Sequence, residues 1–210
     1  MMKLYDHEAA VSPRRVRIFA AEKGIELELV RVDLASGEQM SAGFRRRNPE
    51  CTVPVLELDD GTCISEVIAI CDYLENSKES PLLFGDSPAR RAEVLMWNSR
   101  IEQIGLSSIA DFFRNSVAGM KSRALTGPAD FEQIPALAER GRKRAMLFFQ
   151  RLDSHMDGRR FVAGNTLSIA DITTLACLDF AKRAKLELLD SAPNLERLHG
   201  ELSARPSASA

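Results

Sequence analysis

Residues 51–75 read CTVPVLELDDGTCISEVIAICDYLE and combine the signals of two short strands and a helix. Pro54 interrupts the first apolar run and indicates the start of a strand, because proline cannot donate a hydrogen bond within a sheet. The Asp-Asp-Gly sequence at residues 59–61 predicts a hairpin turn in which the glycine takes a positive φ. A second strand over residues 62–64 and a helix capped by Ser65 should follow. The apolar face of this helix, at helical spacing, is Val67, Ile70, Cys71 and Leu74.

The same stretch offers two binding features a few residues apart. We predict a cis Val53–Pro54 peptide, since an X-Pro bond in a tight turn is where this isomer occurs. A turn of this kind leaves the amide and carbonyl of Val53 free to pair with an extended peptide ligand. The first amides of the helix after Ser65 are unpaired donors at its positive end, which suits a carboxylate. A plain strand, turn and helix without any ligand is the alternative.

Composition excludes several classes of protein. The chain has 210 residues, 45% hydrophobic and 28% charged, with a net charge of −2, as is typical of soluble globular proteins. This charge argues against nucleic acid or an anionic membrane as the main partner. No apolar run approaches the ~18 residues that span a bilayer, and no signal peptide is recognisable. The four cysteines have neither CxxC nor metal-ligand spacing, so we expect reduced thiols, no metal and a cytoplasmic protein.

The order of elements predicts two domains. Up to residue 80 the pattern is strand, helix, strand, helix, strand, strand, helix, which is typical of a thioredoxin-like sheet with a right-handed parallel crossover. Residues 81–87 are polar, with proline and glycine, and are the expected linker. From residue 88 to residue 210 every strong signal is helical. The predicted fold class is therefore α/β plus all-α, with a thioredoxin-like domain over residues 1–80 followed by a helical-bundle domain.

Three short motifs predict where helices begin. Ser12-Pro13 and Ser87-Pro88 each place proline at the first helical position after a capping serine. Ser168 and Asp171 have the spacing of a capping box, in which each side chain bonds the backbone amide of the other residue. We therefore expect Asp171 to be a folding residue and not a catalytic acid.

Residues 48–75, with NPxxTVPVLELDDGT followed by SEVIAICDYLE, resemble the glutathione-binding core of the glutathione S-transferase family. The capping box at residues 168–171 resembles that of the family's C-terminal domain, so the resemblance covers nearly the whole chain. It implies the two-domain glutathione transferase fold and a detoxifying enzyme that joins the glutathione thiolate to a small hydrophobic electrophile. It also implies glutathione as co-substrate with no other cofactor, and a homodimer.

The resemblance assigns roles to the binding residues. Val53, before Pro54, would pair with the cysteinyl backbone of glutathione, and Gln39 would contact its glycine carboxylate. Glu66 and Val67 would hold the γ-glutamyl group, although the family usually has serine where this chain has Val67. In the alternative register, Val67 faces the core and Ser65 supplies the hydroxyl.

The resemblance leaves the catalytic group open. A thiolate attacks and a free thiol has a pKa near ~8.5, so the enzyme must stabilise the anion. The positive end of the helix that starts near Pro13 can contribute. Serine-type members place a hydroxyl two residues before this proline; here that position is Val11, so the donor is either Ser12 or absent. SPRRVRIFAAEKG resembles a fungal and bacterial subgroup without the usual donor, in which a water held by the helical domain is thought to assist; Asn115 and Ser116 are the candidates.

Two other functions are compatible with parts of the sequence. A non-catalytic glutathione-binding or protein-interaction module on the same fold fits the valine at position 67 and the displaced Ser12. Retention on glutathione resin without turnover would favour this module. A disulfide reductase is disfavoured, because no cysteine occupies the first loop.

Overall fold

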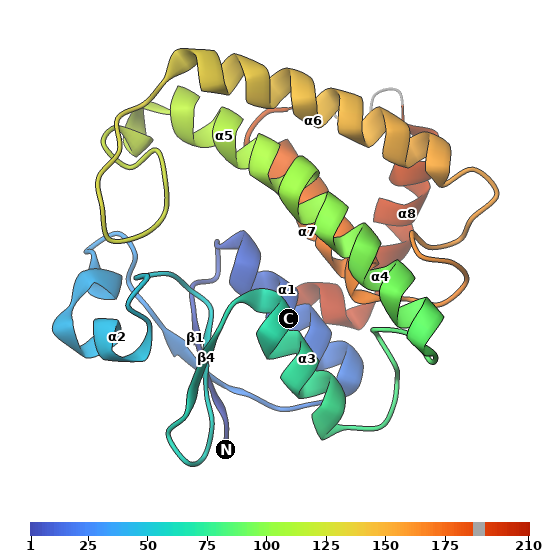
Figure 1. The fold of residues 1–210 in the computed structure, drawn as a ribbon, viewed down its shortest axis with the longest axis horizontal. Coiled ribbons are helices and arrows are strands. Elements are labelled where there is room, and N and C mark those ends of the chain that lie inside the picture. The colour runs from blue at the N-terminus through green and yellow to red at the C-terminus, as the bar shows by residue number, and fades with distance from the viewer. Residues whose placement is uncertain (187–191) are drawn as a thin grey trace. The chain divides into compact units, whose positions relative to one another are not determined.

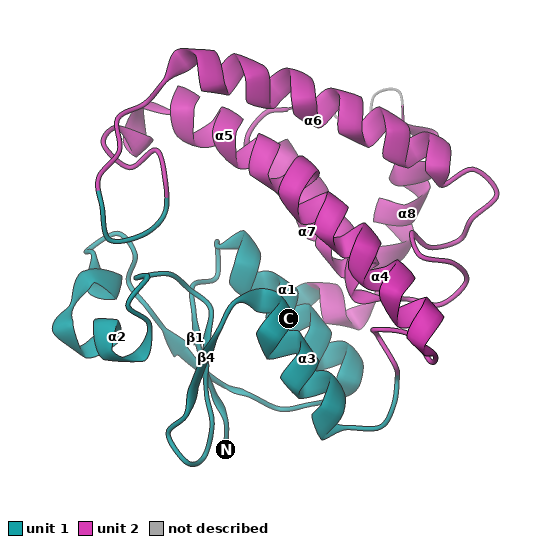
Figure 2. Cartoon of the chain, viewed as in Figure 1, with its two compact units in different colours: residues 1–81, 126–129, 209–210 teal, residues 82–125, 130–208 magenta. Residues whose placement is uncertain are grey.

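The protein is described by a computed structural model that defines residues 1–186 and 192–210. It divides into two compact units (Figure 2). Unit 1 comprises residues 1–81, 126–129 and 209–210, and unit 2 comprises residues 82–125 and 130–208. The main division thus falls inside the stretch expected to be a linker, and four residues of the later loop belong to unit 1.

Unit 1 is a four-stranded mixed sheet with helices, as the predicted thioredoxin-like fold requires (Figure 1). Its sheet has the order β2-β1-β3-β4, in which β1 and β2 are parallel and the other pairs are antiparallel. The elements are β1 (Lys3–Asp6), α1 (Val11–Lys23), β2 (Glu28–Arg31), the 3-10 turn η1 (Glu38–Met40), α2 (Ala42–Arg47), β3 (Val55–Glu57), β4 (Cys63–Ser65) and α3 (Val67–Ser77).

The strands of unit 1 alternate between two buried faces. Tyr5 and Val55 pack with Phe44 of α2 in one cluster, and the rings of Tyr5 and Phe44 meet edge to face at 6.1 Å. Their neighbours Leu4 and Leu56 are fully buried and point to the opposite face, since successive strand residues alternate. Both faces are therefore covered, as in an α/β layer structure.

A buried lysine connects the C-terminal end of α1 to the residues at and after the end of α3. Lys23, at the end of α1, is 1% exposed, and its ammonium lies 3.0 Å from the carboxylate of Glu75. The same Nζ donates to the carbonyls of Lys78 at 2.6 Å and Pro81 at 2.8 Å. Because a buried ammonium needs partners for its protons, Lys23 ties the end of α1 to the chain that follows α3.

Unit 2 is helical, as predicted. Its elements are α4 (Pro88–Arg100), the π-helix η2 (Ile101–Leu106), α5 (Ser107–Ser116), the 3-10 turn η3 (Ala118–Met120), α6 (Pro135–His155), α7 (Ile169–Arg183) and α8 (Pro193–Ser203). A last 3-10 turn, η4 (Pro206–Ser209), reaches the boundary with unit 1. Helices α5 and α6 run side by side (Figure 1). A Cβ at Gly141 would lie 2.6 Å from the Ser108 carbonyl oxygen, so only glycine permits this close approach.

The structure corrects two helix caps and confirms two others. Ser12 does not cap α1, which begins at Val11 after the N-cap Ala10, two residues earlier than predicted. Ser65 does not cap α3, because pairing with Val55 holds it as the last residue of β4. Ser87 caps α4 through the Arg90 amide as expected. The predicted capping box is also present.

None of the helices in the described ranges, 1–186 and 192–210, is both long enough and apolar enough to cross a membrane.

Candidate functional site

Val53 presents a free backbone donor and acceptor. It lies between the turn over residues 48–52 and strand β3, and its peptide bond with Pro54 is cis, as predicted. The ladder begins only at Val55, which pairs with Tyr5 and Ser65. Within the described residues, no backbone hydrogen bond engages the amide or the carbonyl of Val53. Its half-buried main chain can therefore pair with an extended ligand.

The start of α3 lies at the same end of the strand pair. Since Val55 is opposite Ser65, the residues before β3 and after β4 are neighbours. Glu66 is the N-cap of α3, with an exposed side chain that makes no capping bond. The first helical bond runs from the Ile70 amide to the Glu66 carbonyl, so the amides of residues 67–69 remain donors at the positive end of the helix.

Unusual backbone conformations flank this pair of features. Cys51 has a φ of 54° and Glu66 a φ of 69°, a region that side-chain-bearing residues enter at a cost of ~1–3 kcal/mol. One precedes Val53 and the other begins α3. Strain of this kind persists where the surroundings enforce it and often marks ligand sites.

The other predicted glutathione contacts in unit 1 are distributed differently. Val67 is 6% exposed and its side chain is part of the core, so its amide is its accessible group, whereas Ser65 is half-buried. Gln39 lies on η1 and is 7% exposed. Within the described residues its Oε1 has no hydrogen-bond partner, which leaves a buried amide able to bind a ligand group. The structure thus brings Val53, Glu66 and Val67 together and places Gln39 on a separate turn.

The first loop is held by Arg17, for which sequence reasoning predicted no such role. Arg17 is buried, and its Nη1 lies 2.5 Å from the Asp6 carboxylate. Its Nη2 donates to the Glu8 carbonyl at 3.3 Å. The guanidinium therefore folds back from α1 and fixes residues 6–8. Spacing along the helix does not reveal this contact, because it depends on the course of the loop.

Ser12 is the second residue of α1 and is half-buried. It lies in the first turn, where the free amides and the helix dipole favour an anion. In this position its hydroxyl can act as a donor to a ligand even though it does not cap the helix.

Tyr5, the last hydroxyl-bearing residue before the first loop, has a structural environment. Its hydroxyl donates to Glu57 Oε2 at 2.9 Å, and Arg47 Nε donates to the same oxygen at 3.0 Å. Burial, and then the hydrogen bond to Glu57, raise the pKa of Tyr5. The bond from Arg47 lowers the pKa of Glu57. The phenol thus stays protonated and engaged, which disfavours it as the thiol donor.

Asn115 and Ser116 end α5 in unit 2. The Asn115 amide donates to the Asp111 carbonyl at 2.9 Å, and its Oδ1 accepts the Ile134 amide at 2.9 Å. The Ser116 hydroxyl donates to the Phe112 carbonyl at 2.7 Å. The bond with Ile134, the N-cap of α6, connects the end of α5 to the start of α6, whereas the other two lie within α5. A catalytic water held by these two residues stays a prediction.

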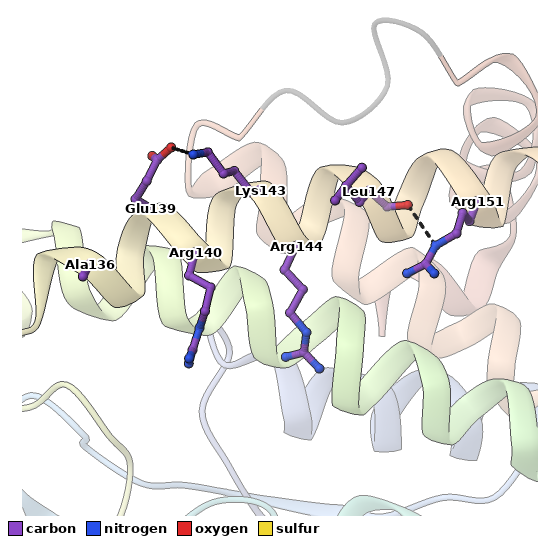
Figure 3. Close-up of a pocket in the computed structure, with 7 residues that line it drawn as sticks. All are labelled: Ala136, Glu139, Arg140, Lys143, Arg144, Leu147 and Arg151. Atoms are coloured by element: carbon purple, nitrogen blue, oxygen red, sulfur yellow. Dashed lines mark hydrogen bonds and ion pairs between the residues drawn. The ribbon is translucent and has the colours of Figure 1, made fainter.

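A groove of about 540 Å³ lies along α6 and is rich in cations (Figure 3). Arg144 donates to the Gln103 carbonyl, and Lys143 pairs with Glu139 at 3.2 Å. The lining residues all belong to one helix: Ala136, Glu139, Arg140, Lys143, Arg144, Leu147 and Arg151. Because one helix supplies the whole lining and its charged side chains pair with neighbouring groups, the groove is a solvated helix face.

Comparison with known proteins agrees with this geometry. Residues 11–77 match the family model for the glutathione S-transferase N-terminal domain, and residues 109–206 match that for the C-terminal domain. Glutathione S-transferase 2 of Saccharomyces cerevisiae is 34% identical over 209 residues, which cover 98% of this chain and 87% of the yeast protein. The chain belongs to the glutathione S-transferase family.

Solved structures place this transferase near the Gtt2 type. A glutathione S-transferase domain-containing protein of Marinobacter aquaeolei VT8 has a TM-score of 0.90 and 36% identity, covering 98% of this chain and 99% of that chain. Gtt2 of Saccharomyces cerevisiae has a TM-score of 0.90 and 33% identity, covering 98% of each chain. The chain is therefore similar to transferases of both fungal and bacterial origin.

Proposed function

We propose that this transferase binds glutathione in unit 1 and conjugates its thiolate to a small hydrophobic electrophile. The observation that supports it most is the free amide and carbonyl of Val53 beside the start of α3. The backbone of the cysteinyl residue pairs with these two groups as an added strand. The γ-glutamyl carboxylate binds the first amides of α3, including that of Val67, and the carboxylate of Glu66 faces the γ-glutamyl ammonium. Gln39 contacts the glycine carboxylate.

The sulfur is placed near the first turn of α1, whose dipole favours the thiolate. Two donors can assist: the hydroxyl of Ser12, or a water held by Asn115 and Ser116. Ser12 is the stronger candidate, because both polar ends of the Asn115 side chain already bind backbone groups. A hydroxyl that donates to the thiolate lowers the pKa of the bound thiol, because it stabilises the charged form.

Membership in the family supports a physiological setting for this activity. We propose a cytoplasmic homodimer that detoxifies electrophiles, with glutathione as co-substrate and without a metal or another cofactor. The second substrate is a small hydrophobic electrophile, as the family resemblance implies.

Calorimetric titration with glutathione, followed by turnover assays with a panel of electrophiles, tests this function. We expect binding and turnover in the intact protein. Ser12→Ala should lower kcat and raise the pKa of the bound thiol, followed by thiolate absorbance, while leaving glutathione affinity nearly unchanged. Binding without turnover of any electrophile would refute conjugation and favour the non-catalytic module. Failure to bind glutathione would refute the whole assignment.

A further inference from the structure

A single buried amide organises the turn that precedes Val53. Asn48 is 2% exposed. Its Nδ2 donates to both the carbonyl and the hydroxyl of Thr52, each at 2.9 Å. Its Oδ1 accepts the Glu50 amide at 3.1 Å, and its own carbonyl accepts the Cys51 amide at 3.0 Å. One residue therefore makes four hydrogen bonds within the turn over residues 48–52.

These bonds hold a conformation that the turn does not prefer by itself. Cys51 has a φ of 54°, which is disfavoured for a residue with a side chain. The Asn48 side chain bonds to Glu50 on one side of Cys51 and to Thr52 on the other. These bonds hold Cys51 in its positive-φ conformation. Without that side chain, residues 50–52 would be free to relax.

Asn48 is in turn fixed to the core. Its amide donates to the Phe44 carbonyl at 2.9 Å, and Phe44 is 4% exposed in the cluster under the sheet. Val53 packs against the same cluster. Asn48 therefore connects a rigid anchor to the residue that presents the free amide and carbonyl.

We infer that Asn48 is a positioning residue for glutathione, which orients the backbone of Val53 through Thr52 and does not itself touch the ligand. This inference rests on the proposed function. Preorganisation of this kind improves affinity, because the ordering of the site is complete before the ligand arrives. If residues around Val53 had to be ordered on binding, affinity would fall by about five- to thirtyfold, which corresponds to fixing the backbone of one residue.

Three variants test this role by calorimetry with glutathione. Asn48→Ala removes all three side-chain bonds and should raise the Kd by roughly tenfold. Asn48→Asp keeps an acceptor for the Glu50 amide but cannot donate to Thr52, so its loss should be intermediate. Thr52→Val removes only the hydroxyl acceptor and should give a smaller loss in the same direction, in a protein that remains folded.

Asn98→Ala is the matched control. Asn98 is 1% exposed in unit 2, accepts from Thr173 at 2.6 Å and donates to Glu102 at 2.9 Å. It should lower the melting temperature about as Asn48→Ala does and leave the glutathione Kd unchanged. In steady-state kinetics, Asn48→Ala should raise KM for glutathione while kcat at saturation and KM for the electrophile stay nearly constant. Amide hydrogen exchange of residues 50–53 should be faster in Asn48→Ala and should slow again when glutathione is added.

The outcomes separate this inference from the proposed function. If Asn48→Ala and Asn98→Ala lose stability alike and both keep the glutathione affinity of the unmodified protein, Asn48 is a folding residue only. The same conclusion follows if Thr52→Val and Asn48→Asp bind normally. If the unmodified protein fails to bind glutathione, the proposed function is wrong, and that result is visible before any variant is made.

Discussion

Asp171 is a buried carboxyl group, and its protonation state can be tested by the pH dependence of protein stability. It is 0% exposed, and its Oδ1 accepts the Val162 amide at 2.8 Å. Its Oδ2 accepts the amide of Ser168 at 2.9 Å and the Ser168 hydroxyl at 2.8 Å. Burial raises the pKa of Asp171 from 3.8 to about 6, against the opposing pull of these hydrogen bonds. The folded protein therefore holds this proton more tightly than the unfolded chain does.

We expect Asp171→Asn to be most destabilising in acid. The amide keeps the shape but can accept on one side only, which leaves a buried donor unpaired at a cost of ~1–3 kcal/mol. Because the pKa of Asp171 is higher in the folded state, its protonation stabilises the fold. This stabilisation is fully present below pH 3.8 and is lost as the pH rises through about 6. The shift is worth ~3 kcal/mol in total, of which roughly 2 kcal/mol falls between pH 4 and pH 7. The cost of Asp171→Asn should shrink by that amount over this interval.

Urea unfolding at a series of pH values measures this cost. Trp97, in α4, is the one tryptophan in the sequence, so its fluorescence reports on unit 2, while far-UV circular dichroism reports on both units. Subtracting the variant from the unmodified protein cancels every other titrating group. Glu139→Gln is the control, because the bond from Arg142 lowers the pKa of this exposed acid; its cost should be small and should grow as the pH rises. If the cost of Asp171→Asn also grows between pH 4 and pH 7, the three donors hold the carboxylate ionised and the reasoning is wrong.

Other substitutions test the binding site and the scaffold. Glu66→Ala should weaken glutathione binding, because it removes the carboxylate proposed to face the γ-glutamyl ammonium. Val67→Ser should change the affinity little, because the side chain at position 67 is buried in the core; tighter binding would show that a hydroxyl there reaches the ligand, and a loss of affinity in Ser65→Ala would favour the alternative register. Glu66→Gly should stabilise the fold by about 1 kcal/mol, because it relieves a φ of 69°, while weakening glutathione binding; lower stability in urea would show that the residue is unstrained. Lys23→Met should lower the free energy of unfolding by about 3–5 kcal/mol, because it removes the buried cation beside Glu75. Unchanged stability in chemical denaturation would mean that packing of the methionine offsets the lost ion pair.

Local signals predicted most elements of this fold, since they depend on neighbours in the sequence. Ser87 before Pro88 predicts the start of α4 because both the cap and the proline act within one turn. Ser65 is different: alone it is a good cap, but its pairing with Val55 makes it a strand residue. The first helical residue of α3 is therefore Val67, one position later than the local signal indicates.

Contacts between distant residues explain what the sequence did not reveal about the site. Arg17 lies eleven residues from Asp6, and its side chain turns back over the loop between them. Asn48 stands at the head of a recognisable pattern, yet its role appears only when its amide is seen to close the turn up to Thr52. The π-helix η2 likewise has no local signature. Its exposed Gln103 carbonyl accepts bonds from Ser107 and from Arg144 of α6.

The nature of the site explains why its shape was easier to predict than its chemistry. The groups proposed to bind glutathione are mostly backbone amides and one carbonyl, which every residue type except proline provides. What the sequence must supply is the conformation that exposes them, through Pro54, the turn at Gly61 with its φ of 85°, and Asn48. A valine in place of the usual serine at position 67 removes one side-chain donor but leaves the amide in place. The binding function should therefore tolerate this change, whereas loss of the turn that orients Val53 should not be tolerated.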